Sequence, residues 1–177
     1  MRKVVDRARL QDFMKALSAQ AKVEGRVYLT GGATAVLSGW RTSTIDIDLK
    51  FVPEQDSLFR AIPKLKESLQ LNIELASPDD FIPPLKGWQE RSPLVAQEGR
   101  IAFHNYDFYA QALSKIERGH ERDVGDVDEM FKRHLVEPEA LRRSFDEIEP
   151  RLYRYPAIDP GAFRRALDEA IAKNARK

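Results

Sequence analysis

The sequence contains no cysteine and only three histidines among its 177 residues. The absence of cysteine excludes disulfide bonds and thiolate catalysis, and so few histidines argue against a structural zinc site. No apolar run approaches the roughly 20 residues that span a bilayer, and the first residues are charged throughout, with no apolar leader segment. We therefore expect a cytoplasmic protein with no membrane partner.

Positive and negative charges nearly balance, because the chain has 29 basic and 28 acidic residues and a formal net charge of +1. Global charge therefore argues neither for nor against a nucleic-acid partner. The chain is 42% hydrophobic, which is enough apolar material for a core. Its length suits one domain, or one domain with an extra helical part.

The spacing of apolar residues predicts an α+β fold. Helical spacing is found over residues 7–23, 33–38 and 55–69. Alternation predicts strands over 27–29, 43–51, 71–75, 94–96 and 101–104. After residue 107 the pattern is helical, interrupted at Gly119 and by a proline-marked linker over 150–160. We expect a small mixed sheet flanked by helices in residues 1–106, and a helical region over 107–177 packed on it.

Two glycines, Gly31 and Gly32, separate a predicted strand from a predicted short helix. Without a Cβ atom the backbone can come close to a ligand. The start of the helix offers N–H groups without helical partners and the positive end of the helix dipole, which suits a phosphate. A plain tight turn also explains a lone Gly-Gly pair.

Asp46 and Asp48 lie two residues apart in a predicted strand. Side chains alternate between the faces of a strand, so both carboxylates point to one side while Ile45, Ile47 and Leu49 enter the core. Neighbouring carboxylates repel each other unless a cation or solvent separates them. Magnesium prefers carboxylate and phosphate oxygens, so the pair is a candidate metal site. The alternative is an edge strand with a solvated acidic face.

Glu74 is the candidate for a third carboxylate. In the strand predicted over 71–75, Asn72 and Glu74 share one face. If this strand lies beside that of the two aspartates, Glu74 completes a three-carboxylate site, which can hold two metal ions. A surface glutamate is the alternative, and Asp79 and Asp80 in the following loop are rival carboxylates.

The combination of these features, in the stretches LTGGATA and RTSTIDIDL, resembles the signature of the nucleotidyltransferase (polymerase-beta-like) fold. It is most similar to small bacterial members found among abortive-infection and toxin–antitoxin nucleotidyltransferases and their uncharacterised relatives. The resemblance implies that Gly31 and Gly32 contact a nucleoside triphosphate and that Asp46 and Asp48 bind magnesium, as one or two ions. It also implies that Glu74 completes the catalytic and metal site.

The resemblance extends to other residues as candidate nucleotide contacts. Arg41 and Thr44 precede the aspartate strand, and Arg41 either contacts the triphosphate or pairs with a carboxylate. In the helical region Lys115 precedes Asp123 and Asp126, as in these relatives. The two aspartates share a helix face, and a lysine can reach a phosphate as a point charge. A solvated, charged helix face is the alternative.

The function that the resemblance implies is transfer of a nucleoside monophosphate, with magnesium, from a nucleoside triphosphate to a hydroxyl acceptor. The acceptor is RNA, with tRNA favoured, or a protein, and the enzyme is a toxin held by an antitoxin protein. Two other functions stay open. One is a nucleotide-binding or regulatory module without turnover, since a fold does not fix a function. The other is a metal-dependent nuclease that uses water as its nucleophile.

Overall fold

The chain forms two compact units in the computed structural model, which describes residues 1–175. The first unit contains residues 1–77 and 92–106, and the second contains residues 78–91 and the chain from 107 onward. The sequence pattern had assigned residues 78–91 to the first part of the chain. In the structure they join the helical unit, where the hydroxyl of Tyr155 donates to the carbonyl of Asp79 and Arg151 donates to that of Pro84.

A five-stranded mixed sheet forms the centre of the first unit, in the order β3-β2-β1-β5-β4. Its strands are β1 (Gly25–Thr30), β2 (Asp46–Val52), β3 (Asn72–Glu74), β4 (Leu94–Glu98) and β5 (Ile101–Asn105). The central strand β1 pairs antiparallel with β2 and parallel with β5. At the edges, β3 runs parallel to β2, and β4 pairs antiparallel with β5. The α+β class expected from the sequence is confirmed.

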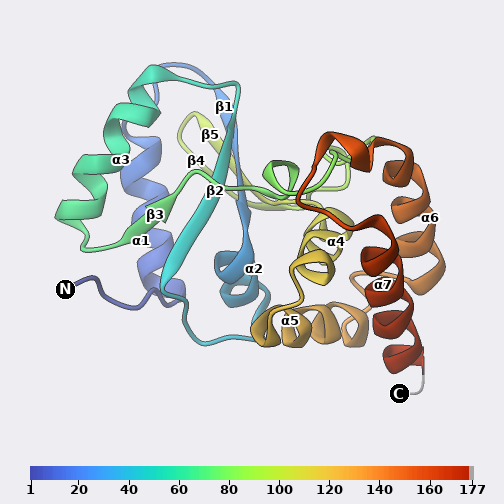
Figure 1. The fold of residues 1–177 in the computed structure, drawn as a ribbon. Helices are drawn as coiled ribbons and strands as arrows, with labels where there is room; N and C mark the ends of the chain where they lie inside the picture. Colours follow the sequence, from blue (N-terminus) through green and yellow to red (C-terminus); the bar gives the residue numbers. More distant parts are fainter. Residues whose placement is uncertain (176–177) are drawn as a thin grey trace. The chain divides into compact units, whose positions relative to one another are not determined.

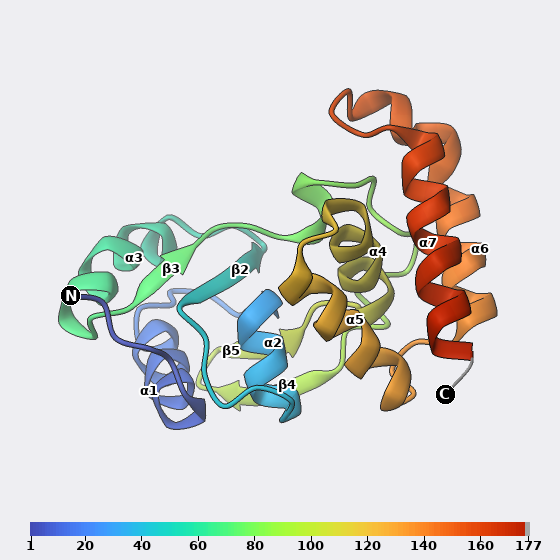
Figure 2. The same ribbon diagram turned by 60° about the horizontal axis from the view of Figure 1, so that its bottom comes forward.

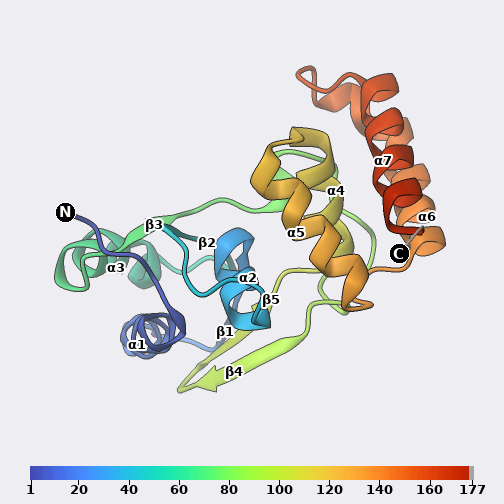
Figure 3. The ribbon, with the colours of Figure 1, turned by 90° about the horizontal axis from the view of Figure 1, so that it is seen from below.

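Three helices belong to this unit: α1 (Arg7–Ser18), α2 (Gly31–Ser38) and α3 (Asp56–Ser68). Helices α1 and α3 lie side by side along the sheet (Figures 1 and 3). The side chain of Asp6 caps α1 by accepting a hydrogen bond from the N–H of Arg9 at 2.9 Å. Gly39, with φ +91°, ends α2 in the left-handed conformation that is common after the last residue of a helix.

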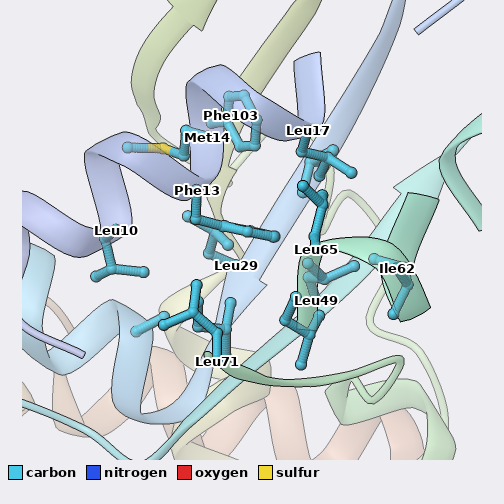
Figure 4. Close-up of a cluster of buried hydrophobic side chains, with 14 of the residues drawn as sticks. Leu10, Phe13, Met14, Leu17, Leu29, Leu49, Ile62, Leu65, Leu71 and Phe103 are labelled. Atoms are coloured by element: carbon cyan, nitrogen blue, oxygen red, sulfur yellow. The ribbon is translucent and has the colours of Figure 1, made fainter. Parts of the chain in front are cut away.

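The core of the first unit lies between the sheet and these helices (Figure 4). The residues labelled in Figure 4 are Leu10, Phe13, Met14, Leu17, Leu29, Leu49, Ile62, Leu65, Leu71 and Phe103. Burial of each large apolar side chain stabilises the fold by about 1.5–3 kcal/mol. Because side chains alternate along a strand, the residues between these apolar positions face away from this core.

Ile45 does not enter the core as predicted, and is 55% exposed. The reason is that β2 begins at Asp46, three residues after the predicted start at residue 43, so Ile45 precedes the strand. The preceding residue, Thr44, instead forms an isolated bridge with Val5, in which each N–H donates to the other residue's carbonyl at 2.9 and 2.7 Å. The N-terminal segment therefore fixes the chain directly before the aspartate strand.

The second unit is helical. Its elements are η1 (Pro78–Asp80), α4 (Phe108–Arg118), α5 (Glu121–Lys132), α6 (Pro138–Ile148), η2 (Glu149–Arg154) and α7 (Pro160–Ala175). Helices α6 and α7 run side by side (Figure 2), and the rings of Phe145 and Phe163 meet edge to face, 4.9 Å apart. Part of the predicted linker over 150–160 is the short helix η2. Within residues 1–175, no helix has the length and apolar character needed to cross a bilayer.

Candidate active site

The two aspartates of β2 lie on the face of the strand that points away from the core. Ile47 and Leu49 are buried, whereas Asp46 and Asp48 are half-buried, which is the alternation expected from the sequence. In the sheet, Asp48 pairs with Thr30 of β1 on one side and with Glu74 of β3 on the other. The acidic residues of β2 and β3 are therefore neighbours across two adjacent parallel strands.

Gly31 brings the start of α2 against one of these carboxylates. A Cβ atom at residue 31 would lie 2.8 Å from Oδ2 of Asp48, and the backbone there has φ +62°. Both facts favour glycine, because a side chain would meet the carboxylate and would strain the left-handed backbone. The helix begins at Gly31, two residues earlier than predicted, so the glycines form its first turn.

Gly32 is needed for a different reason. A Cβ atom at residue 32 would lie 1.9 Å from Oγ1 and 2.7 Å from Cβ of Thr44. Thr44 is buried, and its hydroxyl donates to the carbonyl of Asp46 at 3.2 Å. The glycine pair thus lets the start of α2 approach both the Asp48 carboxylate and the residue that supports Asp46.

Asn72 was not among the predicted site residues, although the alternation of β3 places it beside Glu74. It pairs with Asp46 across the β2–β3 ladder. Its side-chain amide donates a hydrogen bond to Oδ1 of Asp46 and a second one to Oε1 of Glu74, at 3.3 Å. The amide therefore lies between two carboxylates that would otherwise repel each other.

The predicted three-carboxylate centre is not assembled in this structure. The described part of the chain holds no group of three or more His, Cys, Asp or Glu side chains that could bind a metal ion. The donor set of Asp46 and Asp48 nevertheless fits magnesium, which is held in proteins by one or two carboxylates together with substrate phosphates. The missing Cβ at Gly31, directly beside Asp48, is the kind of close backbone approach that a phosphate site needs.

The other predicted contacts of the sheet unit flank this site. Arg41 is half-buried in the loop between α2 and β2, where its N–H donates to the carbonyl of Ala35 at 3.3 Å. Thr44 lies between Gly32 and the backbone of Asp46. A nucleotide contact by either residue stays a prediction. The rival carboxylates Asp79 and Asp80 lie in η1 of the helical unit.

Lys115, Asp123 and Asp126 form a buried cluster between α4 and α5. Asp123 and Asp126 share the buried face of α5, as their spacing predicts. The Lys115 ammonium is 2.8 Å from Asp126 and 3.3 Å from Asp123, and Arg118 reaches Asp123 at 3.0 Å. These contacts join the two helices, and a role of the cluster in nucleotide binding stays a prediction.

Comparison with known proteins identifies a family but no individual relative. No curated protein and no solved structure gives a significant match to the chain. A family model described as "nucleotidyltransferase of unknown function" (DUF6036) matches residues 8–156. This range includes Gly31, Gly32, the aspartates of β2 and the helices through η2. The chain is therefore a member of the DUF6036 family of nucleotidyltransferases of unknown function.

Proposed function

We propose that this protein transfers a nucleoside monophosphate from a nucleoside triphosphate to a hydroxyl acceptor, with magnesium as cofactor. The observation that carries the proposal is the contact of the first turn of α2 with the aspartate strand, where Gly31 lies against Oδ2 of Asp48. The first-turn N–H groups and dipole of α2 suit a phosphate. The carboxylates of Asp46 and Asp48 suit the metal that accompanies a triphosphate.

In this proposal each residue has a distinct task. Gly31 and Gly32 hold the phosphates, and Asp46 and Asp48 hold magnesium, which when bound neutralises charge that develops on the phosphates. Glu74, exposed on the neighbouring strand, accepts the proton of the acceptor hydroxyl. The hydroxyl oxygen then forms a bond to the α-phosphorus in line with the bond to the bridging oxygen that breaks. Pyrophosphate leaves with the electron pair of that bond.

The test is transfer of label from each of the four α-labelled nucleoside triphosphates to total RNA and to protein, in the presence of magnesium. Asp46→Asn and Asp48→Asn variants should each lose at least about a hundredfold in rate, since both remove a charge from the metal site. Asp12→Asn, the same change at an exposed position of α1, is the matched control and should keep full activity. Equal labelling by all variants would refute the proposal.

The acceptor and the biological setting are proposed from the family resemblance. We infer that the acceptor is RNA, with tRNA the first candidate, and that a protein hydroxyl is the alternative. We also infer a growth-inhibiting toxin that an antitoxin protein silences. Growth arrest on expression of the wild type, relieved by Asp48→Asn, supports the toxin. Normal growth with active enzyme in the cells contradicts it.

A second candidate function is a nucleotide-binding module without turnover. The observation that favours it is that residues 1–175 contain no group of three acidic or histidine side chains that could bind a metal. Such a module binds a nucleoside triphosphate with magnesium but transfers no label. The same labelling experiment, run beside equilibrium nucleotide binding, separates it from the transferase. RNA shortened without added nucleotide would instead indicate a nuclease.

A further inference from the structure

The side-chain amide of Asn72 connects two acidic residues of the candidate site. Its Nδ2 atom donates a hydrogen bond to Oδ1 of Asp46 on the neighbouring strand. The same atom lies 3.3 Å from Oε1 of Glu74, two residues further along β3 on the same face. An amide nitrogen carries two N–H groups, so one nitrogen can serve both carboxylates.

We propose that Asn72 is a positioning residue that holds Asp46 in the orientation in which it binds the metal. This inference rests on the proposed function, because it takes Asp46 as a metal ligand. Metal-binding carboxylates are themselves usually hydrogen-bonded, and these supporting bonds fix the ligand and tune its affinity. A bond to Oδ1 leaves Oδ2 of Asp46 to the cation.

The backbone of Asp46 is fixed separately from its side chain. The hydroxyl of Thr44 donates to the Asp46 carbonyl at 3.2 Å, and Thr44 is in turn paired with Val5. With the backbone fixed in this way, the remaining freedom of Asp46 is the rotation of its side chain. Asn72 restrains this rotation, so its removal costs the entropy of ordering the carboxylate when the metal binds.

The chemistry of residue 72 also matters. Asn72 is neutral, so it separates Asp46 from Glu74 without adding charge to a site that already carries several carboxylates. An aliphatic side chain of similar size, such as leucine, would keep the volume but would donate no hydrogen bond. Asn72→Leu therefore tests the hydrogen bonds, and Asn72→Ala tests the same loss with a smaller side chain.

The experiment measures binding of Mn²⁺ alone to the full chain by water-proton relaxation, without nucleotide and without any activity assay. The wild type is compared with Asn72→Leu, Asn72→Ala, Asp46→Asn and the double variant Asp46→Asn/Asn72→Leu. Both changes at residue 72 should weaken Mn²⁺ binding about tenfold, the lower end of the effect of residues that support metal ligands. In the Asp46→Asn background, Asn72→Leu should change the Kd by less than about twofold, because its effect passes through Asp46.

The outcomes separate this inference from the proposed function. A wild type that binds no Mn²⁺ in the absence of nucleotide overturns the positioning role of Asn72, and the labelling experiment then decides the proposed function separately. A wild type that binds Mn²⁺ as tightly as both variants at residue 72 overturns the role of Asn72 and leaves the metal site standing. A loss that is equally large with and without the Asp46 carboxylate also overturns it, because it shows general damage. Melting curves identify any variant that fails to fold. If one of the two variants at residue 72 does not fold, the Mn²⁺ affinity of the other decides the role of Asn72.

Discussion

The ammonium of Lys115 lies 2.8 Å from Asp126, and the two side chains are only 5% and 3% exposed. Asp123, 9% exposed, lies 3.3 Å from the same ammonium. One buried positive charge thus lies beside two buried negative ones. The more exposed Arg118 supplies a second positive charge, 3.0 Å from Asp123. Such a cluster is costly to break, because loss of one partner leaves a buried charge without compensation.

Lys115→Met should therefore lower the free energy of unfolding by about 3–5 kcal/mol, measured by urea denaturation. Adding Asp126→Asn should recover part of this loss, since it removes the carboxylate that lies nearest to the lost ammonium. Lys132→Met, at an exposed position near the end of α5, is the matched control and should change stability by less than about 0.5 kcal/mol. Unchanged stability together with lost nucleotide binding would instead support a phosphate contact for Lys115.

Gly31→Ala should weaken Mn²⁺ binding and nucleotide transfer, because the new methyl group would lie 2.8 Å from Oδ2 of Asp48. Gly39→Ala is the control, since Gly39 also has a positive φ but a Cβ there would meet no atom of the described chain within 4 Å. Both variants should lose about 1–2 kcal/mol of stability from backbone strain. Only the change at residue 31 should affect the metal. Equal Mn²⁺ affinity of the two variants would contradict the contact.

Gly32→Ala should destabilise the protein by about 1–3 kcal/mol through overpacking against the buried Thr44. The opposite is expected for Gly125→Ala in the interior of α5. A Cβ at residue 125 would meet no atom of residues 1–175 within 4 Å, apart from its chain neighbours and the backbone of its own helix, and the φ of Gly125 is not positive. This change should stabilise the protein by about 0.5–1 kcal/mol. Thermal denaturation of both variants measures the difference, and a Gly32→Ala variant as stable as the wild type would count against the close approach.

Glu117→Gln should stabilise the protein at neutral pH. Burial raises the pKa of Glu117 more than the nearby Arg118 lowers it. A raised pKa in the folded state means that the contribution of Glu117 to stability is present below its unfolded pKa and is lost as pH rises through its folded value. Glutamine does not ionise, so a glutamine at residue 117 avoids this loss of stability. The melting temperature of the variant should therefore exceed that of the wild type at pH 7, with the gap closing toward about pH 4. A gap of the same size at both pH values would contradict the assignment.

Local patterns predicted most of the first unit. The alternation in β2 placed Asp46 and Asp48 on one face because that face depends only on the two-residue period of a strand. The two glycines were singled out for the same kind of local reason. The predicted interruption of the helical pattern at Gly119 marks the end of α4, where the backbone is left-handed.

What the sequence did not predict depends on contacts between distant segments. The bridge of Asn72 to Asp46 requires that β3 lie beside β2 in one particular register. The fit of Gly32 against Thr44 requires the loop before β2 to fold back on α2. The burial of Lys115 requires the packing of α4 on α5, whereas a charged helix position is by default exposed.

The path of the chain also limits how this protein can be built and divided. The chain passes from one unit to the other after residues 77, 91 and 106. During synthesis, the central strand β1 can therefore pair with β5 only after residues 78–91 of the other unit have been made. A single cut after residue 106 would leave those residues without the helices that they contact. Recombination at one point in the gene therefore cannot exchange either unit as a complete module.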